Sequence, residues 1–423
     1  MREMKDSGVE WVGQIPKDWE KTKIKTVCSF VGSGTTPASN IIEYYDNGTI
    51  DWIQSGDIYG KNNIDEVKTK ITTLALNSNT SLRIYKAPFI VMAMYGGSVG
   101  NTAISHIDAC TNQACCCIKT NENANLSYMY YWLLLCKEDF LIRAEGGGQP
   151  NISQDKIKNQ YFFVSNYAEQ KKIADCLDEK CSEIDVLTSD IQKQIDTLEQ
   201  YKKSVITEAV TKGLNPDAEM KDSGVKWLKQ IPSSWSVMPN KYLMHKIKEI
   251  CPVYKDEDIL SLTMKGVVIR DLDAGGKMPT SFDGYQRLHK GNLLMCLFDI
   301  DVTPRCIGLI NDEGLSSPAY SQFVLENIAD SRYFTYYYTM LDNDKTLLHL
   351  AKNLRHSLTE DLLGEVPTAV PPIDEQKKIA DFLDKKCSEI DTIISDKKKQ
   401  LEVITEYKKS LIYEYVTGKK EVM

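Results

Sequence analysis

Two stretches of the 423-residue chain carry apolar residues in a seven-residue repeat. The first runs from residue 169 to about 211 and contains no Gly or Pro. Its apolar seam is formed by Leu177, Ile184, Ile191, Leu198 and Val205, with Ile173, Leu187, Ile195 and Tyr201 filling in. Such a sustained repeat predicts a long helix within a coiled coil.

The second stretch, from residue 375 to about 416, repeats the pattern. Its seam contains Leu383, Ile390, Ile404 and Leu411, accompanied by Ile379, Ile393, Ile394, Leu401 and Tyr407. Lys397 interrupts this seam, so we expect local repacking there. Gly213 and Gly418 are predicted to end the two helices. At about 1.5 Å per residue, each helix would be on the order of 60 Å long.

The remaining sequence contains short alternating or β-rich runs separated by turn residues. Strands are predicted at residues 49–53, 87–94, 115–119, 291–298 and 322–325. Turns are predicted at Asn47-Gly48, Gly96-Gly97 and Gly146-Gly-Gly148, and helices at residues 127–142 and 331–341. The pattern therefore indicates the α+β class, with two mixed α/β domains in addition to the two long helices.

Two internal repeats define the organisation of the chain. Residues 4–19 return as 220–235 with 11 of 16 positions identical, and residues 169–185 return as 375–391 with 15 of 17 identical. The intervening residues, 20–168 and 236–374, show no comparable identity. The predicted divisions are an N-terminal repeated segment (1–19), a first variable domain (20–168), a central helix (169–212), a linker with the second repeated segment (213–235), a second variable domain (236–374) and a C-terminal helix (375–423).

A duplicated frame around two different inserts indicates a scaffold that presents two surfaces in equivalent positions, with an internal pseudo-two-fold. Each helix needs a partner along its seam, and the other copy is the obvious one. A two-fold relation between the halves would make the pair antiparallel. The alternative is that each helix packs only on its own domain.

Composition limits the class of protein. The chain has 51 Lys plus Arg against 59 Asp plus Glu, a net charge of -8, and 42% hydrophobic residues. These values fit a soluble globular protein of two or three domains. Without a long apolar run or a signal peptide, the chain is predicted to be cytoplasmic, and its 12 cysteines to be free thiols. The acidic balance means that any DNA binding would have to be local.

Neither variable domain is basic overall, since the first has 13 basic against 13 acidic residues and the second 14 against 19. Side chains that read base edges or grip phosphates would therefore have to be concentrated at one surface. The candidates in the first domain are Arg143, Gln149 and Asn151. Those in the second domain are Lys265, Arg270, Lys277, Arg287 and Arg305.

Several enzymatic patterns are present only as fragments. Phe30-Val-Gly-Ser-Gly34 fits a short S-adenosylmethionine loop, but the chain lacks the Asn/Asp-Pro-Pro-aromatic run of an amino-methyltransferase. Asp51 with Glu66-Val-Lys68 is too loose to define a metal nuclease, and Cys110 with Cys115-Cys-Cys117 lacks zinc-site spacing. There is no GxxxxGK[ST] phosphate loop. We therefore expect this chain to have no catalytic centre, metal site or bound cofactor.

The organisation resembles the specificity subunit of type I restriction-modification enzymes over essentially the whole chain. The matching motifs are Ser7-Gly-Val-Glu-Trp11, Ser223-Gly-Val-Lys-Trp227, Ser33-Gly-Thr-Thr-Pro37, Gly314-Leu-Ser-Ser-Pro-Ala-Tyr320 and Pro371-Pro-Ile-Asp-Glu-Gln376. The resemblance implies two target recognition domains that each read one half of a bipartite DNA sequence, spaced by an antiparallel coiled coil.

The resemblance also implies double-stranded DNA, two methyltransferase subunits and, for cleavage, motor-nuclease subunits as partners, with no membrane association. S-adenosylmethionine, ATP and Mg²⁺ would then be bound by the partner subunits. Two alternatives stay open from the sequence: a DNA methyltransferase acting alone through Phe30 to Gly34, and a protein-binding scaffold.

Overall fold

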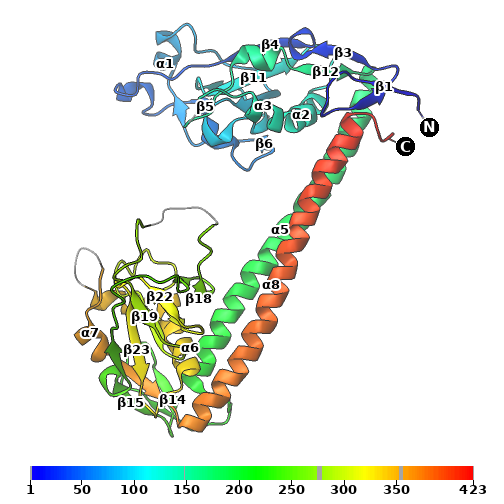
Figure 1. The fold of residues 1–423 in the computed structure, drawn as a ribbon. Helices are drawn as coiled ribbons and strands as arrows, with labels where there is room; N and C mark the ends of the chain where they lie inside the picture. The colour runs from blue at the N-terminus through cyan, green and yellow to red at the C-terminus, as the bar shows by residue number, and fades with distance from the viewer. Residues whose placement is uncertain (1, 147, 274–278, 352–355, 423) are drawn as a thin grey trace. The chain divides into compact units, whose positions relative to one another are not determined.

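The computed structural model describes residues 2–146, 148–273, 279–351 and 356–422. It consists of two compact units, unit 1 (Met1–Ile191 with Gln400–Met423) and unit 2 (Gln192–Lys399). Two long helices, α5 (Tyr167–Lys212) and α8 (Ile373–Val416), contribute residues to both units (Figure 1). The long helices predicted from residues 169 and 375 are thereby confirmed. The mixture of helices and strands confirms the α+β class.

Unit 1 contains a central sheet of five strands in the order β4-β11-β8-β9-β6, covered by α2. A second sheet has the order β10-β5-β7, and two further strand pairs are β1-β2 and β12-β3. The strands are β1 (Met4–Asp6), β2 (Gln14–Pro16), β3 (Glu20–Lys23), β4 (Cys28–Ser33), β5 (Ile50–Ile53), β6 (Asn63–Ile64), β7 (Lys70–Ile71), β8 (Phe89–Ala93), β9 (Thr102–Ser105), β10 (Ala109–Thr111), β11 (Cys115–Thr120) and β12 (Tyr161–Val164). The helices are η1 (Ile24–Thr26), η2 (Ile42–Tyr44), η3 (Ser55–Ile58), α1 (Thr73–Ser78), η4 (Gly96–Ser98), α2 (Leu126–Leu135), α3 (Lys137–Ile142) and α4 (Gln154–Lys158).

Unit 2 contains a four-stranded sheet in the order β16-β23-β20-β21, with α6 packed on β21. The pairs β13-β14, β15-β24, β17-β18 and β19-β22 complete it. The strands are β13 (Met220–Asp222), β14 (Gln230–Pro232), β15 (Ser236–Pro239), β16 (Met244–Ile247), β17 (Leu260–Thr263), β18 (Gly266–Ile269), β19 (Gln286–Leu288), β20 (Leu293–Met295), β21 (Ile307–Leu309), β22 (Gly314–Ser316), β23 (Ser321–Leu325) and β24 (Pro367–Val370). The helices are η5 (Asn240–Tyr242), α6 (Ser331–Asn343), η6 (Thr346–Leu350) and α7 (Glu360–Gly364).

The two units share one topology although their variable sequences are unrelated. Strands β4, β11, β8 and β9 of unit 1 occupy the same order as β16, β23, β20 and β21 of unit 2. A helix follows the sheet in both, α2 in unit 1 and α6 in unit 2. The predicted strands are confirmed, as is the helix near 331–341, while the helix predicted at 127–142 is divided into α2 and α3 at Cys136.

Within each unit the segments of α5 and α8 run antiparallel. In unit 1 the Asp185 carboxylate pairs with Lys408 at 2.6 Å, and Cys176 lies beside Tyr415. Unit 2 contains the repeat-equivalent pair, in which Lys202 contacts Asp391 at 2.6 Å. As the residue number rises along α5 it falls along α8, so the antiparallel coiled coil is confirmed.

Part of the predicted seam is wrong. Buried or partly buried residues are spaced alternately four and three apart, as in Leu177, Cys181, Ile184, Thr188 and Ile191. Leu187 and Tyr201 each precede a seam position by one residue, so they turn away from the partner helix and are 50% and 53% exposed. Their repeat equivalents on α8, Ile393 and Tyr407, are 45% and 56% exposed for the same reason.

The other seam residues face the partner helix. Leu177, Ile184, Ile191, Leu383, Ile390 and Leu411 are buried, and Leu198, Val205 and Ile404 are partly buried. Lys397 is also partly buried, and its ammonium donates a hydrogen bond to the Gln194 side chain on α5. The repacking expected there is therefore a polar contact across the seam.

The repeated N-terminal segments cover helix ends. In unit 1, Trp19 is fully buried beside Tyr128, whose hydroxyl donates to the Val416 carbonyl at 2.9 Å. In unit 2, Trp235 lies beside Tyr333, whose hydroxyl donates to the Val210 carbonyl at 3.2 Å. These tyrosines satisfy carbonyls that the last turn of each long helix leaves open.

A buried glutamine joins each long helix to the connection before α2 or α6. The Gln170 amide accepts from the Asn125 backbone N–H at 2.9 Å and donates to the carbonyls of Asn123 and Ser165. Gln376 makes the same three bonds in unit 2, and both side chains are fully buried. The two copies of the repeated sequence therefore build the same hydrogen-bonded frame. None of the described helices combines the length and apolar character that a membrane span needs.

Candidate nucleic-acid interface

One edge of the central sheet in unit 1 gathers polar and glycine-rich loops. The register pairs Cys116 with Ser33, Cys115 with Ala93 and Met92 with Thr102, so β4 and β8 end where β11 and β9 begin. We call this surface loop edge 1. It comprises residues 33–37, 94–101, 112–114, 145, 146 and 148–153.

Hydrogen bonds tie these loops into one unit. The Gly96 N–H donates to the Pro150 carbonyl at 2.7 Å, and the Ile152 N–H donates to the Met94 carbonyl at 2.9 Å. The Gln154 side chain donates to the Ser33 hydroxyl at 2.6 Å, which fixes the start of α4 against the end of β4. Residues 94–96 and 150–152, far apart in sequence, thus lie side by side.

The corresponding edge of the four-stranded sheet in unit 2 is loop edge 2, residues 248–250, 296–306 and 317–320. Its register is equivalent, since Ile247 pairs with Gln322 and Met295 with both Ser321 and Ile307. Phe298 and Tyr320 stack on this edge with ring centroids 6.2 Å apart and planes 13° from parallel. Both units therefore present different side chains from the same place in the fold.

The predicted contact residues of unit 1 divide into two groups. Gln149 and Asn151 are exposed on loop edge 1, and reciprocal backbone hydrogen bonds between Asn151 and Glu145 hold this loop. The Arg143 guanidinium is instead bonded to Asp139 and Gln160 within the unit. The geometry thus leaves the two amides available for a ligand and gives the arginine a local structural role.

The predicted residues of unit 2 are more scattered. Lys265 is exposed in the turn between β17 and β18, and Arg270 directly follows β18. Arg287 forms ion pairs with Glu257 at 2.9 Å and Glu249 at 3.4 Å, and the hydrogen bond that Arg287 donates to the Glu257 carboxylate raises the pKa of Arg287. Lys277 lies outside the described residues.

Arg305 holds a loop in place. Its side chain is 15% exposed and contacts Asp342 of α6 at 3.3 Å and Asn343 at 3.2 Å. In unit 1 the equivalent end of the β8–β9 loop is held by a hydrogen bond of 2.7 Å from Lys137 to Asn101. The two contacts hold equivalent loops, the one before β9 in unit 1 and the one before β21 in unit 2. The geometry of Arg305 therefore indicates that it positions loop edge 2 and does not contact a ligand itself.

The sequence reasoning missed the aromatic residues of these edges. Tyr95 is 45% exposed on loop edge 1, next to the Gly96-Gly97 turn, and Phe298 and Tyr320 occupy loop edge 2. A tyrosine before a glycine pair was the available signal for Tyr95. Nothing in the sequence marks Phe298, because its neighbour Tyr320 is 22 positions away and only the sheet register brings them together.

The fragments of enzymatic motifs have structural explanations. A Cβ at Gly34 would lie 1.8 Å from the Thr111 carbonyl oxygen, so this glycine permits close packing of β4 on β10. Asp51 is paired with Lys70 at 2.6 Å. Burial raises the pKa of Cys110 to about 11 and that of Cys117 to about 12, which keeps both as thiols at neutral pH. Within the described ranges no group of three or more His, Cys, Asp or Glu residues could hold a metal ion.

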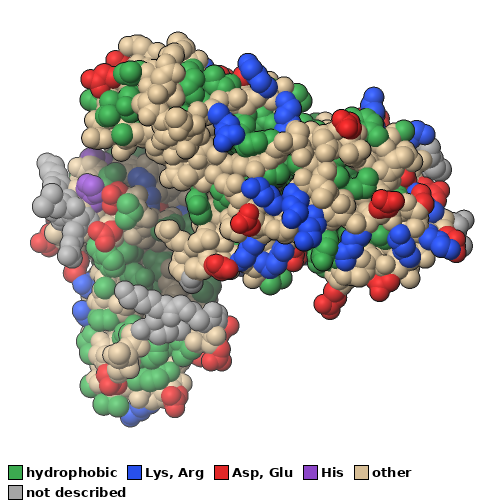
Figure 2. Space-filling view, turned by 90° about the horizontal axis from the view of Figure 1, so that it is seen from above, with side chains coloured by type: hydrophobic (Ala, Val, Ile, Leu, Met, Phe, Trp, Pro, Cys, Tyr) green, Lys and Arg blue, Asp and Glu red, His purple; other side chains and the backbone are tan. Residues whose placement is uncertain are grey.

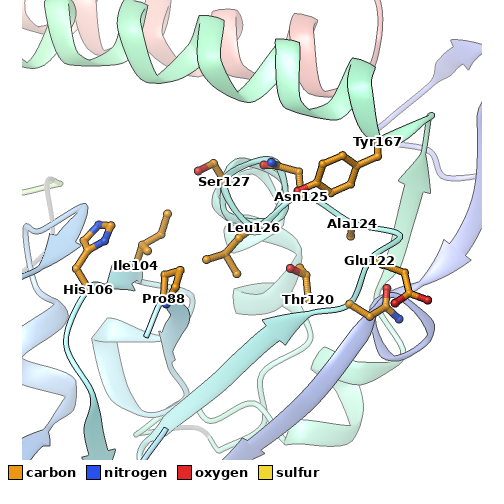
Figure 3. Close-up of a pocket in the computed structure, with 11 residues that line it drawn as sticks. Pro88, Ile104, His106, Thr120, Glu122, Ala124, Asn125, Leu126, Ser127 and Tyr167 are labelled. Atoms are coloured by element: carbon orange, nitrogen blue, oxygen red, sulfur yellow. The ribbon is translucent and has the colours of Figure 1, made fainter. Parts of the chain in front are cut away.

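A pocket of about 590 Å³ opens at the opposite edge of the unit 1 sheet. Figure 3 shows Pro88, Ile104 and Leu126 along its floor, with His106 and Glu122 toward its two ends. The described lining contains one carboxylate and no Lys or Arg. The pocket lies at the edge of the sheet away from the exposed amides of Gln149 and Asn151, so loop edge 1 remains the candidate surface.

Comparisons with known proteins agree with this reading of the fold. A family model for the type I restriction modification DNA specificity domain matches residues 16–197. The MjaVIII type I restriction enzyme specificity subunit of Methanocaldococcus jannaschii is 24% identical over 439 residues, which cover 97% of this chain and 94% of the relative. The EcoR124I/EcoR124II specificity subunit of Escherichia coli is 28% identical over 198 residues, 45% of this chain and 46% of the relative.

A solved structure concerning complex assembly and conformational transition of the type I restriction-modification system contains a chain with the same fold. Its TM-score is 0.71 at 11% identity, with 95% of this chain and 98% of the other covered. The duplicated frame and its two divergent loop edges define a recognition scaffold. Over residues 16–197 the chain matches the specificity-domain model, and over 97% of its length it is similar to type I restriction enzyme specificity subunits. These similarities support the reading as a non-catalytic DNA-recognition subunit over the reading as an independent methyltransferase.

Proposed function

We propose that each unit reads one half of a bipartite DNA target through its loop edge. The observation that carries this proposal is the shared strand order of the two units beneath loops of unrelated sequence. A frame that is repeated while its loops differ allows two different half-sequences to be read from equivalent positions. The amides of Gln149 and Asn151 are suited to hydrogen bonding with base edges, and Tyr95, Phe298 and Tyr320 supply apolar contacts.

We propose that α5 and α8 set the spacing between the half-sites and bind two methyltransferase subunits. Support comes from two equivalent apolar patches, Leu187 with Tyr407 in unit 1 and Ile393 with Tyr201 in unit 2. Each patch flanks an Asp–Lys link of 2.6 Å that joins the two helices. Positions that flank a coiled-coil seam usually carry charged residues, so exposed Leu, Ile and Tyr at repeat-equivalent positions favour one kind of partner bound twice.

The remaining activities are assigned to partner chains. S-adenosylmethionine would be held by the methyltransferase subunits, and ATP and Mg²⁺ by motor-nuclease subunits that join for cleavage. The complex would act on double-stranded DNA in the cytoplasm. Phosphate contacts by these partners would account for recognition by a chain with a net charge of -8.

Replacing Gln149 and Asn151 with alanine is expected to relax one half of the methylated motif. Loss of a paired amide contact removes roughly 1–3 kcal/mol of discrimination against the wrong base. The measurement is long-read methylation mapping in cells that contain the cognate methyltransferase subunit, with the chain absent, wild-type or altered.

Wild-type chain should produce a split motif that is absent without it, and the double variant should accept additional bases in one half only. Asn123→Ala is the matched control, because Asn123 is exposed at the opposite edge of the unit 1 sheet. An unchanged motif in the double variant would remove these two amides from the proposal. Absence of any motif with wild-type chain would reject the proposed function itself.

A further inference from the structure

A group of lysines covers one face of unit 1. It is formed by the consecutive elements β3 and η1 (residues 20–26) together with α4 (residues 154–158), and α4 packs against η1. The members of this basic face are Lys21, Lys23, Lys25, Lys156 and Lys158. With Glu20 and Asp155 as the carboxylates on the same three elements, five positive charges stand against two negative ones.

Three of these lysines form no ion pair with the described residues of the chain. Among the described residues, Lys25 and Lys158 form no ion pair or hydrogen bond, and Lys23 contacts only the Asn159 side chain at 3.3 Å. Lys156 is paired with Glu145, and Lys21 lies over the Tyr161 ring at 4.0 Å. Figure 2 looks onto the side of unit 1 that carries β3 and β12, and blue Lys and Arg side chains gather along it.

Unit 2 has no such face at the equivalent elements. There β15 carries no charge, η5 carries Lys241, and α7 carries Glu360 and Asp361. Lys241 is paired with Glu365, and Glu360 with Lys246. The two units therefore share the same elements at this place, but only those of unit 1 carry a cluster of lysines.

The basic face is continuous with loop edge 1. Helix α4 begins directly after the loop that carries Gln149 and Asn151, and its first residue, Gln154, is bonded to Ser33 of that edge at 2.6 Å. A polyanion that contacts the exposed amides can thus continue onto Lys158 and Lys25 without leaving the unit.

We propose that this basic face binds the phosphate backbone of duplex DNA that flanks the half-site read by unit 1, and that unit 2 makes no equivalent flanking contact. The proposal rests on the proposed function of loop edge 1. An acidic protein is the less favoured ligand, because the face adjoins the candidate base-reading loops and is made of mobile point charges, which suit a regular phosphate array.

The test compares the wild-type methyltransferase complex with one that contains Lys23→Gln, Lys25→Gln and Lys158→Gln. Duplexes containing the mapped target would have about 15 base pairs beyond both half-sites, or be trimmed to about 2 on one side or the other. Wild-type complex should lose roughly 10- to 100-fold in affinity when the flank beside the unit 1 half-site is removed, and little when the other is removed. The triple variant should bind all three duplexes with the affinity that the wild-type complex shows for the duplex without the flank beside the unit 1 half-site. Its slope of log affinity against log salt concentration should be smaller in magnitude by about 3.

Two further variants make the result specific. Asp361→Lys with Leu362→Lys adds charge at the equivalent place in unit 2, where both side chains are exposed, and should create dependence on the second flank. Lys377→Gln, Lys378→Gln and Lys385→Gln remove equal charge from exposed positions of α8 and should leave dependence on the first flank intact. Equal affinity of the wild-type complex for all three duplexes, with target methylation intact, would overturn the inference while leaving the proposed function standing.

Discussion

Replacing Gly418 with alanine is expected to destabilise unit 1 by about 3–5 kcal/mol. Gly418 ends α8 with φ +70°, a left-handed conformation that costs an alanine roughly 1–2 kcal/mol. The added Cβ would also lie 2.4 and 2.5 Å from Cγ and Cδ of Pro16 and 3.0 Å from the Trp19 ring. Pro16 and Trp19 are buried, so the overlap can be relieved only by moving the segment that covers the helix end.

Gly213 at the end of α5 is the matched control. It has φ +74°, but its added Cβ would meet the Glu375 carboxylate oxygen at 2.9 Å and the Trp235 ring at 3.3 Å. A flexible carboxylate can move, so Gly213→Ala should cost only about 1–2 kcal/mol. Urea unfolding of both variants, with amide hydrogen exchange to localise the loss, measures the difference. Equal destabilisation would contradict the packing described for Pro16 and Trp19.

Replacing Leu187 and Tyr407 with glutamine is expected to remove one of the two methyltransferase subunits from the complex. Both side chains are about half exposed, so the fold should change by less than about 0.5 kcal/mol. Truncating a central apolar contact in an interface typically costs 2 kcal/mol or more. Two such changes on one patch should therefore weaken that subunit by at least about 100-fold, while the patch of Tyr201 and Ile393 still binds the other.

Native mass spectrometry or mass photometry would count the bound subunits. Ser182→Gln with Ser189→Gln, at exposed positions on the other flank of α5 in unit 1, should retain both subunits. Changing Tyr201 and Ile393 should remove one subunit as well, and changing all four residues should remove both. Retention of two subunits by the four-residue variant would exclude these patches as the docking surface.

The repeated frame could be predicted from the sequence, because helix periodicity, glycine stops and near-identical repeats are all local signals. The error at Leu187, Tyr201, Ile393 and Tyr407 has a specific cause. An apolar residue beside a seam position looks like part of the seam, and only the facing helix determines which of two neighbouring residues is buried. Those four residues form the two apolar patches proposed to bind the methyltransferase subunits.

The candidate interface could be predicted only in part. The exposure of Gln149 and Asn151 could be predicted, because a glycine-rich loop exposes its polar residues. Arg287 and Arg305 are cations whose acidic partners lie 30 or more positions away, at Glu257 and Asp342, so the sequence could not distinguish a structural ion pair from a DNA contact. The adjacency of residues 94–96 and 150–152 likewise depends on long-range hydrogen bonds.

Exchange of residues 236–374 for the corresponding segment of a relative tests the central claim most directly. The exchange keeps both repeated segments and both long helices while replacing loop edge 2. Methylation mapping in cells with the cognate methyltransferase subunit should show a motif in which one half and the spacer length are unchanged and the other half is new. A motif altered in both halves, or unaltered in both, would contradict the assignment of one half-site to each unit.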